Sequence, residues 1–175
     1  MGDSPIRMLA RMAVLAALLV AQGPVAASPA PNTGDAVYIV VRHAQKASGD
    51  DPLLTPEGEA HAQALAAALA DAGVTAIYAT PYRRTQATAA PLAARTGIEV
   101  THYEPGDAEA TAAAIRARHP HGTVLVVGHS NTVPELVEAF AGIALPPMPE
   151  TDYSRLYVIA AGADGRARLL RLSMP

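Results

Sequence analysis

Five basic residues of this sequence have the types and spacing to do chemistry: Arg42, His43, Arg83, Arg84 and His129. An arginine presents a fork of N–H donors that matches the oxygens of a phosphate, and each charge-assisted hydrogen bond contributes about 1.5–3 kcal/mol. A histidine beside arginines stays neutral, because nearby positive charge disfavours the imidazolium, and a neutral imidazole can attack phosphorus. We therefore expect a phosphate site in which His43 attacks and His129 donates to the phosphate oxygens.

These residues follow apolar runs of the sequence. The runs are Ala36–Val41, Ala76–Ala79 and Thr123–Val127. Such runs are typical of strands that are buried in a parallel sheet. Ligands of these sheets bind beyond the carboxyl ends of the strands, so we expect the basic side chains to meet at one edge of the sheet.

Helical patterns alternate with the apolar runs. The expected helices are Pro56–Ala72, Arg83–Thr96, Ala108–His119 and Val133–Phe140. Further strands are expected at Glu99–Tyr103, Leu156–Ala161 and Ala167–Leu172, the last two around the turn pair Asp164-Gly165. The alternation predicts an α/β fold, with a mostly parallel central sheet flanked by helices on both faces.

The ends of the first expected helix carry specific signals. Thr55 precedes Pro56, which places a favoured N-cap residue before a proline at the first helical position. Gly58 stands where a capping box would have a glutamate, so it weakens this start. Gly73 follows the apolar run, and we expect the helix to stop there.

The first 27 residues have the pattern of a secretory signal peptide. Arg7 and Arg11 make the first region positive, Met12–Ala21 is uncharged and apolar, and Val25–Ala27 is a small-residue cleavage site before Ser28. A transmembrane anchor is the alternative, but the apolar run is about half of the ~20 residues that a bilayer requires. We expect a periplasmic or secreted protein without a stable membrane anchor after cleavage.

The rest of the chain is long enough for one domain. Residues 28–35 contain proline and glycine and are expected to form a flexible leader, and residues 36–175 a single domain. The chain has no cysteine, which excludes disulfides and a lipid anchor on cysteine. Its net charge is −3, and −4 without residues 1–27, so we expect no binding to nucleic acid.

Four segments of the sequence occur in the order and spacing of a known family. They read VVRHAQK, LTPEGEAHAQAL, TPYRRTQATAAPLA and VLVVGHSN. Together they resemble the histidine phosphatase superfamily, which includes the cofactor-dependent phosphoglycerate mutases, over nearly all of residues 37–140. The resemblance implies a phosphoglycerate-mutase-like fold and a covalent phosphohistidine on His43, with Arg42, Arg84 and His129 as the substrate-binding residues that complete the phosphate pocket.

The chain departs from the family pattern at three positions. Ala44 stands where the family commonly has glycine, Gln45 where it often has glutamate, and the glutamine after the second arginine is displaced to Gln86. Ala44 adds only a methyl group, so we expect activity to survive. The aligned Thr-Pro-x-x-Arg element places Arg84 in the pocket. Arg83 then points away from the phosphate at the start of the helix, and a contact with the substrate is one role open to it.

A general acid is needed to release an alcohol leaving group, and the family usually takes it from the segment after the second helix. That segment reads HYEPGDAEA and contains Glu104 and Asp107. We predict Asp107 as the catalytic acid, although it is also placed to be the N-cap of the helix that begins at Ala108. Glu104 is the second candidate, or a solvated carboxylate.

The residues around His129 have open roles. Asn131 and Thr132 follow it after Ser130, and they either cap the next helix or line the substrate site. A metal site built on His43 and His129 would need a third ligand, and none is obvious, so we expect no metal.

The sequence as a whole favours an exported, metal-independent phosphatase without a cofactor. It would hydrolyse a phosphomonoester or a phospho-residue, which makes a phosphorylated small molecule or residue its partner. The segment after the second helix is too short for the insertion that carries the acid in the mutases, which favours hydrolysis. A phosphoryl transferase or mutase, and a non-catalytic protein that binds a phosphate ligand, are the alternatives.

Overall fold

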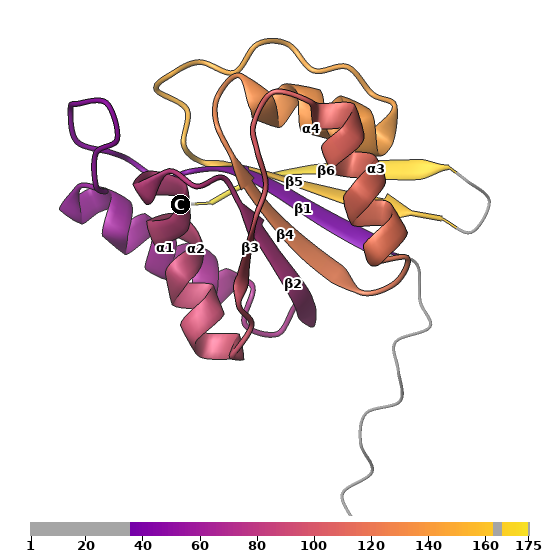
Figure 1. The fold of residues 1–175 in the computed structure, drawn as a ribbon, viewed down its shortest axis with the longest axis horizontal. Coiled ribbons are helices and arrows are strands. Elements are labelled where there is room, and N and C mark those ends of the chain that lie inside the picture. Colours follow the sequence, from indigo (N-terminus) through magenta and orange to yellow (C-terminus); the bar gives the residue numbers. More distant parts are fainter. Residues whose placement is uncertain (1–35, 163–165, 175) are drawn as a thin grey trace, which may run out of the picture. The chain divides into compact units, whose positions relative to one another are not determined.

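The computed structural model describes residues 36–162 and 166–174 of the chain. Within these residues the chain forms one six-stranded sheet and four helices (Figure 1). The expected signal peptide (1–27), the expected leader (28–35) and the expected turn pair Asp164-Gly165 lie outside the described residues, so these expectations remain predictions.

The strands pair in the order β3-β2-β4-β1-β5-β6. Their bounds are β1 (Ala36–Arg42), β2 (Val74–Ala79), β3 (Val100–His102), β4 (Thr123–Gly128), β5 (Arg155–Ala161) and β6 (Ala167–Ser173). β4 is parallel to both β1 and β2, and β3 is parallel to β2, whereas β5 is antiparallel to β1 and β6 to β5. The sheet is therefore mixed and mostly parallel, as predicted.

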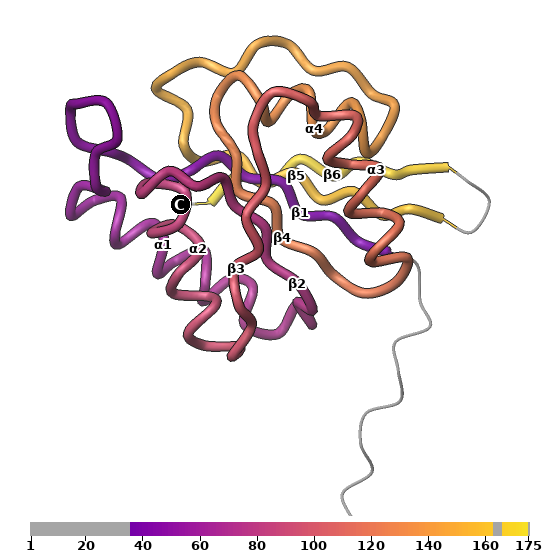
Figure 2. Tube along the Cα trace, in the orientation of Figure 1, coloured from indigo at the N-terminus to yellow at the C-terminus, as the bar shows by residue number. Residues whose placement is uncertain are grey.

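The helices cover both faces of this sheet (Figures 1 and 2). Their bounds are α1 (Pro56–Ala68), α2 (Arg83–Thr96), α3 (Ala108–Arg118) and α4 (Thr132–Ala141). α1 and α2 bury Leu65 and Leu92 against one face, and α3 and α4 bury Ile115 and Leu136 against the other. Because a fully buried leucine contributes about 1.5–3 kcal/mol, these contacts hold the helices firmly on the sheet.

The central strands bring the predicted site residues together. β1 and β4 pair in parallel with Arg42 opposite Gly128, and the backbone N–H of His43 donates to the Gly128 carbonyl at 2.9 Å. His43 directly follows β1, and His129 directly follows β4. The two histidines therefore lie next to each other at the ends of neighbouring strands. Both strands are buried along almost their whole length, which makes this edge of the sheet a rigid platform.

The first helix begins as predicted but ends early. Thr55 Oγ1 accepts the backbone N–H of Gly58 at 3.1 Å, which confirms Thr55 as the N-cap. The helix ends at Ala68, with Leu69 as its C-cap, and not at Gly73. Gly73 has φ +63° and lies directly before β2, so its left-handed conformation shapes the turn into the strand and not the helix end.

Gly58 has a structural reason that the capping pattern did not reveal. A Cβ atom on this residue would lie 2.0 Å from the carbonyl oxygen of Gln45. The same carbonyl accepts the backbone N–H of Thr55 at 3.0 Å. The first turn of α1 is thus in direct backbone contact with the loop that follows His43, and only glycine permits this approach.

Candidate active site

His43 is buried at the carboxyl end of β1, and its ring nitrogens have different roles. Nδ1 lies 2.8 Å from the carbonyl oxygen of Ala44. Because a carbonyl oxygen only accepts, Nδ1 carries the ring proton and Nε2 keeps its lone pair. Burial, and after it the positive charges of Arg42 and Arg84, lower the pKa of His43 to about 4 against the opposing effect of the Ala44 carbonyl. The ring is neutral at pH 7.

His129 lies beside His43, with the ring centroids 5.4 Å apart and the rings edge to face. Its hydrogen bonds determine its tautomer. Thr85 Oγ1 donates to the carbonyl oxygens of Thr80 and Tyr82, at 2.8 and 2.7 Å, so its single proton is used there. Thr80 Oγ1 must then donate to Thr85 Oγ1 and accept from His129 Nε2, at 3.0 Å. The neutral His129 ring therefore has its proton on Nε2 and its lone pair on Nδ1.

The predicted donor role of His129 depends on a change of protonation. Nδ1 lies 3.5 Å from Arg84 Nη2 and accepts from it. Burial, and after it the charges of Arg84 and Arg42, lower the pKa of His129 to about 4. Donation from Nδ1 to a phosphate oxygen requires the imidazolium, which the negative charge of a bound phosphate favours.

Arg84 lies in the first turn of α2, next to this histidine. Its guanidinium carbon lies 4.4 Å from the centroid of the Tyr82 ring, and Nη1 is 3.5 Å from Asp51 Oδ1. Its Nε is buried and has no hydrogen-bond partner in the part of the chain that the structure describes. Arg83 is exposed, and its backbone N–H donates to Asp51 Oδ1 at 3.0 Å. Arg84 is therefore the arginine that this helix places beside His129.

Arg42 is buried and is largely engaged by the protein itself. Its Nη1 donates to the carbonyl oxygens of Pro149, Glu150 and Asp152, and Nη2 pairs with Glu150 Oε2 at 2.8 Å. Its guanidinium carbon lies 4.1 Å from the centroid of the Tyr153 ring. Of its three nitrogens only Nε has no partner among the described residues, so the protein itself occupies most of this guanidinium as it stands.

A cavity of about 330 Å³ joins these elements. It is lined by His43, Lys46, Tyr82, Arg84, Pro105, His129, Ser130, Asn131, Thr132 and Glu150. The residues around the start of α4 contribute to the lining, and the N-terminus of a helix favours a bound anion. Two neutral histidines, two cationic side chains and a helix N-terminus make this cavity suited to a phosphorylated ligand.

A comparison with protein families places the site in a known context. The model of the histidine phosphatase superfamily (branch 1) matches residues 38–105, from β1 through the segment after β3. Over these residues the chain is similar to the histidine phosphatase superfamily. The match includes Arg42, His43 and Arg84, whereas His129 lies beyond the matched residues.

Solved phosphatase structures share the fold of this chain. The protein histidine phosphatase SixA complexed with tungstate has a TM-score of 0.67 at 20% identity, with 78% of this chain and 96% of that one covered. A mycobacterial glucosyl-3-phosphoglycerate phosphatase complexed with VO3 has 0.65 at 18%, covering 79% and 99%. Phosphoserine phosphatase from Entamoeba histolytica in complex with 3-phosphoglyceric acid has 0.59 at 15%, covering 80% and 98%. The comparison with curated proteins gives no match.

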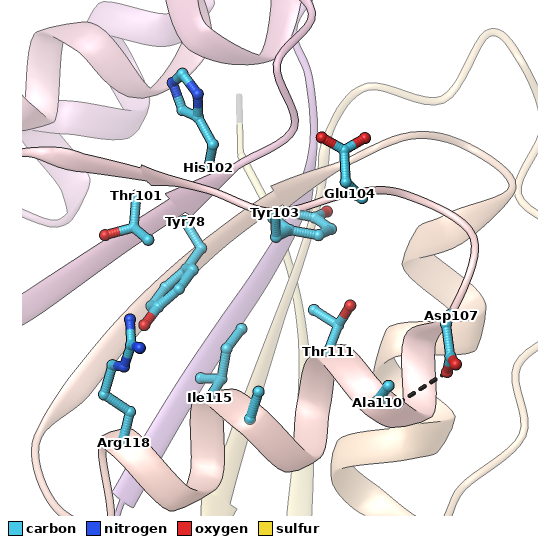
Figure 3. A pocket seen from close by; sticks show the side chains of 11 residues that line it. Tyr78, Thr101, His102, Tyr103, Glu104, Asp107, Ala110, Thr111, Ile115 and Arg118 are labelled. Atoms are coloured by element: carbon cyan, nitrogen blue, oxygen red, sulfur yellow. Dashed lines mark hydrogen bonds between the residues drawn. The ribbon is translucent and has the colours of Figure 1, made fainter.

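The structure keeps Asp107 apart from the cavity that His43 lines. Asp107 Oδ1 accepts the backbone N–H of Ala110 at 2.8 Å and so caps α3, as Figure 3 shows. Asp107 and Glu104 line a different cavity of about 410 Å³, between β3 and α3 (Figure 3). From this segment Pro105 reaches the lining around His43. The acid role of Asp107 stays a prediction, and it would require this segment to move.

Asn131 and Thr132 line the cavity. Neither side chain caps α4, which was one of the two roles considered from the sequence. Asn131 takes the N-cap position without a side-chain cap hydrogen bond. Thr132 Oγ1 accepts the backbone N–H of His129 at 2.9 Å, so it holds the turn that orients the histidine.

Lys46, Ser130 and Glu150 are among the cavity residues that were not predicted from the sequence. Lys46 and Ser130 lie within the motifs that contain His43 and His129. Their closeness to these histidines in the sequence could have indicated that they line the site. Glu150 carried no such signal, because it lies in a connection without regular structure between α4 and β5. Within residues 36–162 and 166–174 no group of three His, Asp or Glu side chains could hold a metal, and no helix is long and apolar enough to cross a membrane.

Proposed function

We propose that the chain is a metal-independent phosphatase that hydrolyses a phosphomonoester or a phosphorylated residue through a covalent phosphohistidine on His43. The observation that carries this proposal is the tautomer of His43. The bond from Nδ1–H to the Ala44 carbonyl leaves the lone pair on Nε2, in a ring that lines the cavity. The low pKa of the ring keeps this lone pair available at neutral pH.

In the first half-reaction, Nε2 forms a bond to phosphorus and the bond from phosphorus to the leaving oxygen breaks. The ring becomes positive, and the Ala44 carbonyl stabilises that charge through Nδ1–H. The buried Nε–H groups of Arg42 and Arg84 are donors for the phosphoryl oxygens, and protonated His129 adds another. The leaving oxygen takes a proton from an acid, for which Asp107 remains the proposed residue.

In the second half-reaction, water attacks phosphorus and the bond to Nε2 breaks. Inorganic phosphate leaves and His43 returns to its neutral form, with the proton still on Nδ1. The leaving group of this step is a neutral imidazole, because Nδ1–H remains bound to Ala44 throughout. No separate acid is needed for it.

The substrate class and location are part of the same proposal. A protein histidine phosphatase and a glucosyl-3-phosphoglycerate phosphatase both have this fold, which supports either a phospho-residue or a small phosphoester as substrate. The signal-peptide pattern of residues 1–27 supports a periplasmic or secreted enzyme.

Turnover of an aryl phosphate in the presence of a metal chelator tests this function. We expect the wild type to release phosphate and His43→Ala to lose at least about 10³-fold in kcat, since the nucleophile is gone. Phosphate or tungstate should still bind to His43→Ala. Turnover that survives in His43→Ala, or that disappears with the chelator, would contradict the proposal.

A further inference from the structure

The connection between α4 and β5, residues 142–154, brings a carboxylate to the His43 cavity. Figure 2 shows this connection as a long orange segment. Glu150 Oε2 lies 2.8 Å from Arg42 Nη2, and Glu150 Oε1 accepts from Ser130 Oγ at 2.5 Å. Among the described residues that line the cavity, Glu150 is the only carboxylate.

Both sides of Glu150 are anchored, so its place in the cavity is defined. Arg42 binds three backbone carbonyls of residues 149–152. Tyr153 lies over the Arg42 guanidinium, and its ring centroid is 6.1 Å from that of His43. Asp152 accepts from the backbone N–H and hydroxyl of Ser154 and from Arg155 Nε, which fixes the path into β5. The buried arginine thus positions the segment that carries Glu150.

Glu150 is ionised and in contact with water. The hydrogen bond from Ser130, and after it the charge of Arg42, lower the pKa of the Glu150 carboxyl, outweighing its partial burial. Its side chain is 79% exposed. An ionised carboxylate cannot give a proton to a leaving group, but it can take one from a water molecule.

We propose that Glu150 is the general base of the second half-reaction, held in place by Arg42 and Ser130. This inference rests on the proposed function, because it acts on the phosphohistidine at His43. A Glu150 oxygen takes one proton from the attacking water as the oxygen–phosphorus bond forms and the bond to Nε2 breaks. Hydrogen phosphate and neutral His43 result, and Glu150 then releases its proton to solvent.

The same carboxylate opposes phosphate binding. It holds Arg42 Nη2, a donor that a phosphate oxygen could take, and it adds negative charge to the cavity. Replacing Glu150 by glutamine removes this charge at nearly equal size. If Glu150 is the base, Glu150→Gln should bind an oxyanion more tightly and hydrolyse the phosphoenzyme more slowly than the wild type.

The test uses the isosteric variant Glu150→Gln and rapid mixing with p-nitrophenyl phosphate, whose leaving group needs little protonation. We expect Glu150→Gln to release one nitrophenolate per site at a rate near that of the wild type, and then to turn over about 10²–10⁴-fold more slowly. Phosphate should accumulate on His43, and tungstate should bind at least as tightly as to the wild type. Glu99→Gln removes one exposed carboxylate before β3 and is the matched control, with wild-type kinetics expected.

Two results would overturn the role of Glu150. One is steady-state turnover of Glu150→Gln equal to the wild type. The other is a loss in turnover without phosphoenzyme, which would show that the first half-reaction was damaged. Should Glu150→Gln not fold, Ser130→Ala keeps the carboxylate without its hydrogen bond, and a several-fold accumulation of phosphoenzyme is expected. Wild-type turnover without any phosphate on His43 would instead refute the proposed function, and the base with it.

Discussion

His43 and His129 are two buried histidines that the protein keeps neutral with opposite tautomers. The proton of His43 is on Nδ1, because the Ala44 carbonyl accepts it, and the proton of His129 is on Nε2, because Thr80 accepts it. Each ring therefore has one lone pair, on Nε2 of His43 and on Nδ1 of His129. The first suits a nucleophile, and the second suits a group that becomes a donor when a phosphate brings its charge.

Acid should destabilise the fold through these two histidines. Their folded pKa of about 4 lies below the ordinary 6.5, so the unfolded chain binds protons that the folded chain does not. Stability is then complete above pH 6.5 and falls between pH 6.5 and 4, by about 2 kcal/mol for each ring at pH 5. Urea unfolding at pH 7 and pH 5 measures this loss. In His43→Asn the loss should be smaller by about 2 kcal/mol, and an unchanged loss would contradict the neutral ring.

The sequence could predict the site residues that lie at the ends of strands, but not the one that lies in a long connection. His43 and His129 directly follow buried strands, and Arg84 follows β2 after a short turn, so their meeting depended on topology alone. Glu150 meets Arg42 across 108 residues of sequence. That contact depends on the path of a connection that has neither hydrophobic period nor secondary structure.

Elements position the site through backbone contacts as well as through side chains. The first turn of α1 rests on the Gln45 carbonyl, two residues after His43, and α4 begins with Thr132 bound to the His129 backbone. The sequence predicted both helices from their periodicity, and the start of α1 from Thr55 and Pro56. It placed the end of α1 too late, because the alanine-rich pattern continues into the turn before β2.

Gly58→Ala tests the contact between α1 and the loop after His43. The added Cβ would lie 2.0 Å from the Gln45 carbonyl oxygen, and backbone on both sides must shift to relieve it. We expect a loss of about 1–3 kcal/mol in the free energy of unfolding and a fall in kcat at temperatures where the variant is still folded. Gly49→Ala is a control in the same loop region, where a Cβ meets nothing within 4 Å, although its φ of +121° imposes strain without contact. Wild-type stability and activity in Gly58→Ala would show that the approach is not needed.

Asp107→Ala separates the cap of α3 from an acid. As a cap, Asp107 accepts the Ala110 N–H, and its loss should cost about 1 kcal/mol of stability with little change in aryl phosphate turnover. Thermal unfolding and steady-state kinetics on aryl and alkyl phosphates measure both effects. A fall in turnover confined to alkyl phosphates, whose leaving groups need a proton, would assign the acid to Asp107.

The net charge of the whole molecule differs in sign from the local charge around the cavity. The chain is mildly acidic, with a net charge of −3, so its overall field does not attract an anion. The cations that would bind a phosphate are gathered at one sheet edge, where Arg84 and Lys46 line the cavity and the ends of β1 and β4 supply the histidines. Topology could be predicted from the alternation of strands and helices, whereas the depth and lining of the cavity could not.

The most direct measurement is the detection of phosphate on His43 during turnover. The protein would be mixed with an aryl phosphate, stopped at neutral or alkaline pH because phosphohistidine is labile in acid, and digested for mass spectrometry. The account predicts a phosphoryl group on the peptide that contains His43, increased in Glu150→Gln and absent from His43→Ala. Steady turnover with His43 unmodified in both the wild type and Glu150→Gln would contradict it.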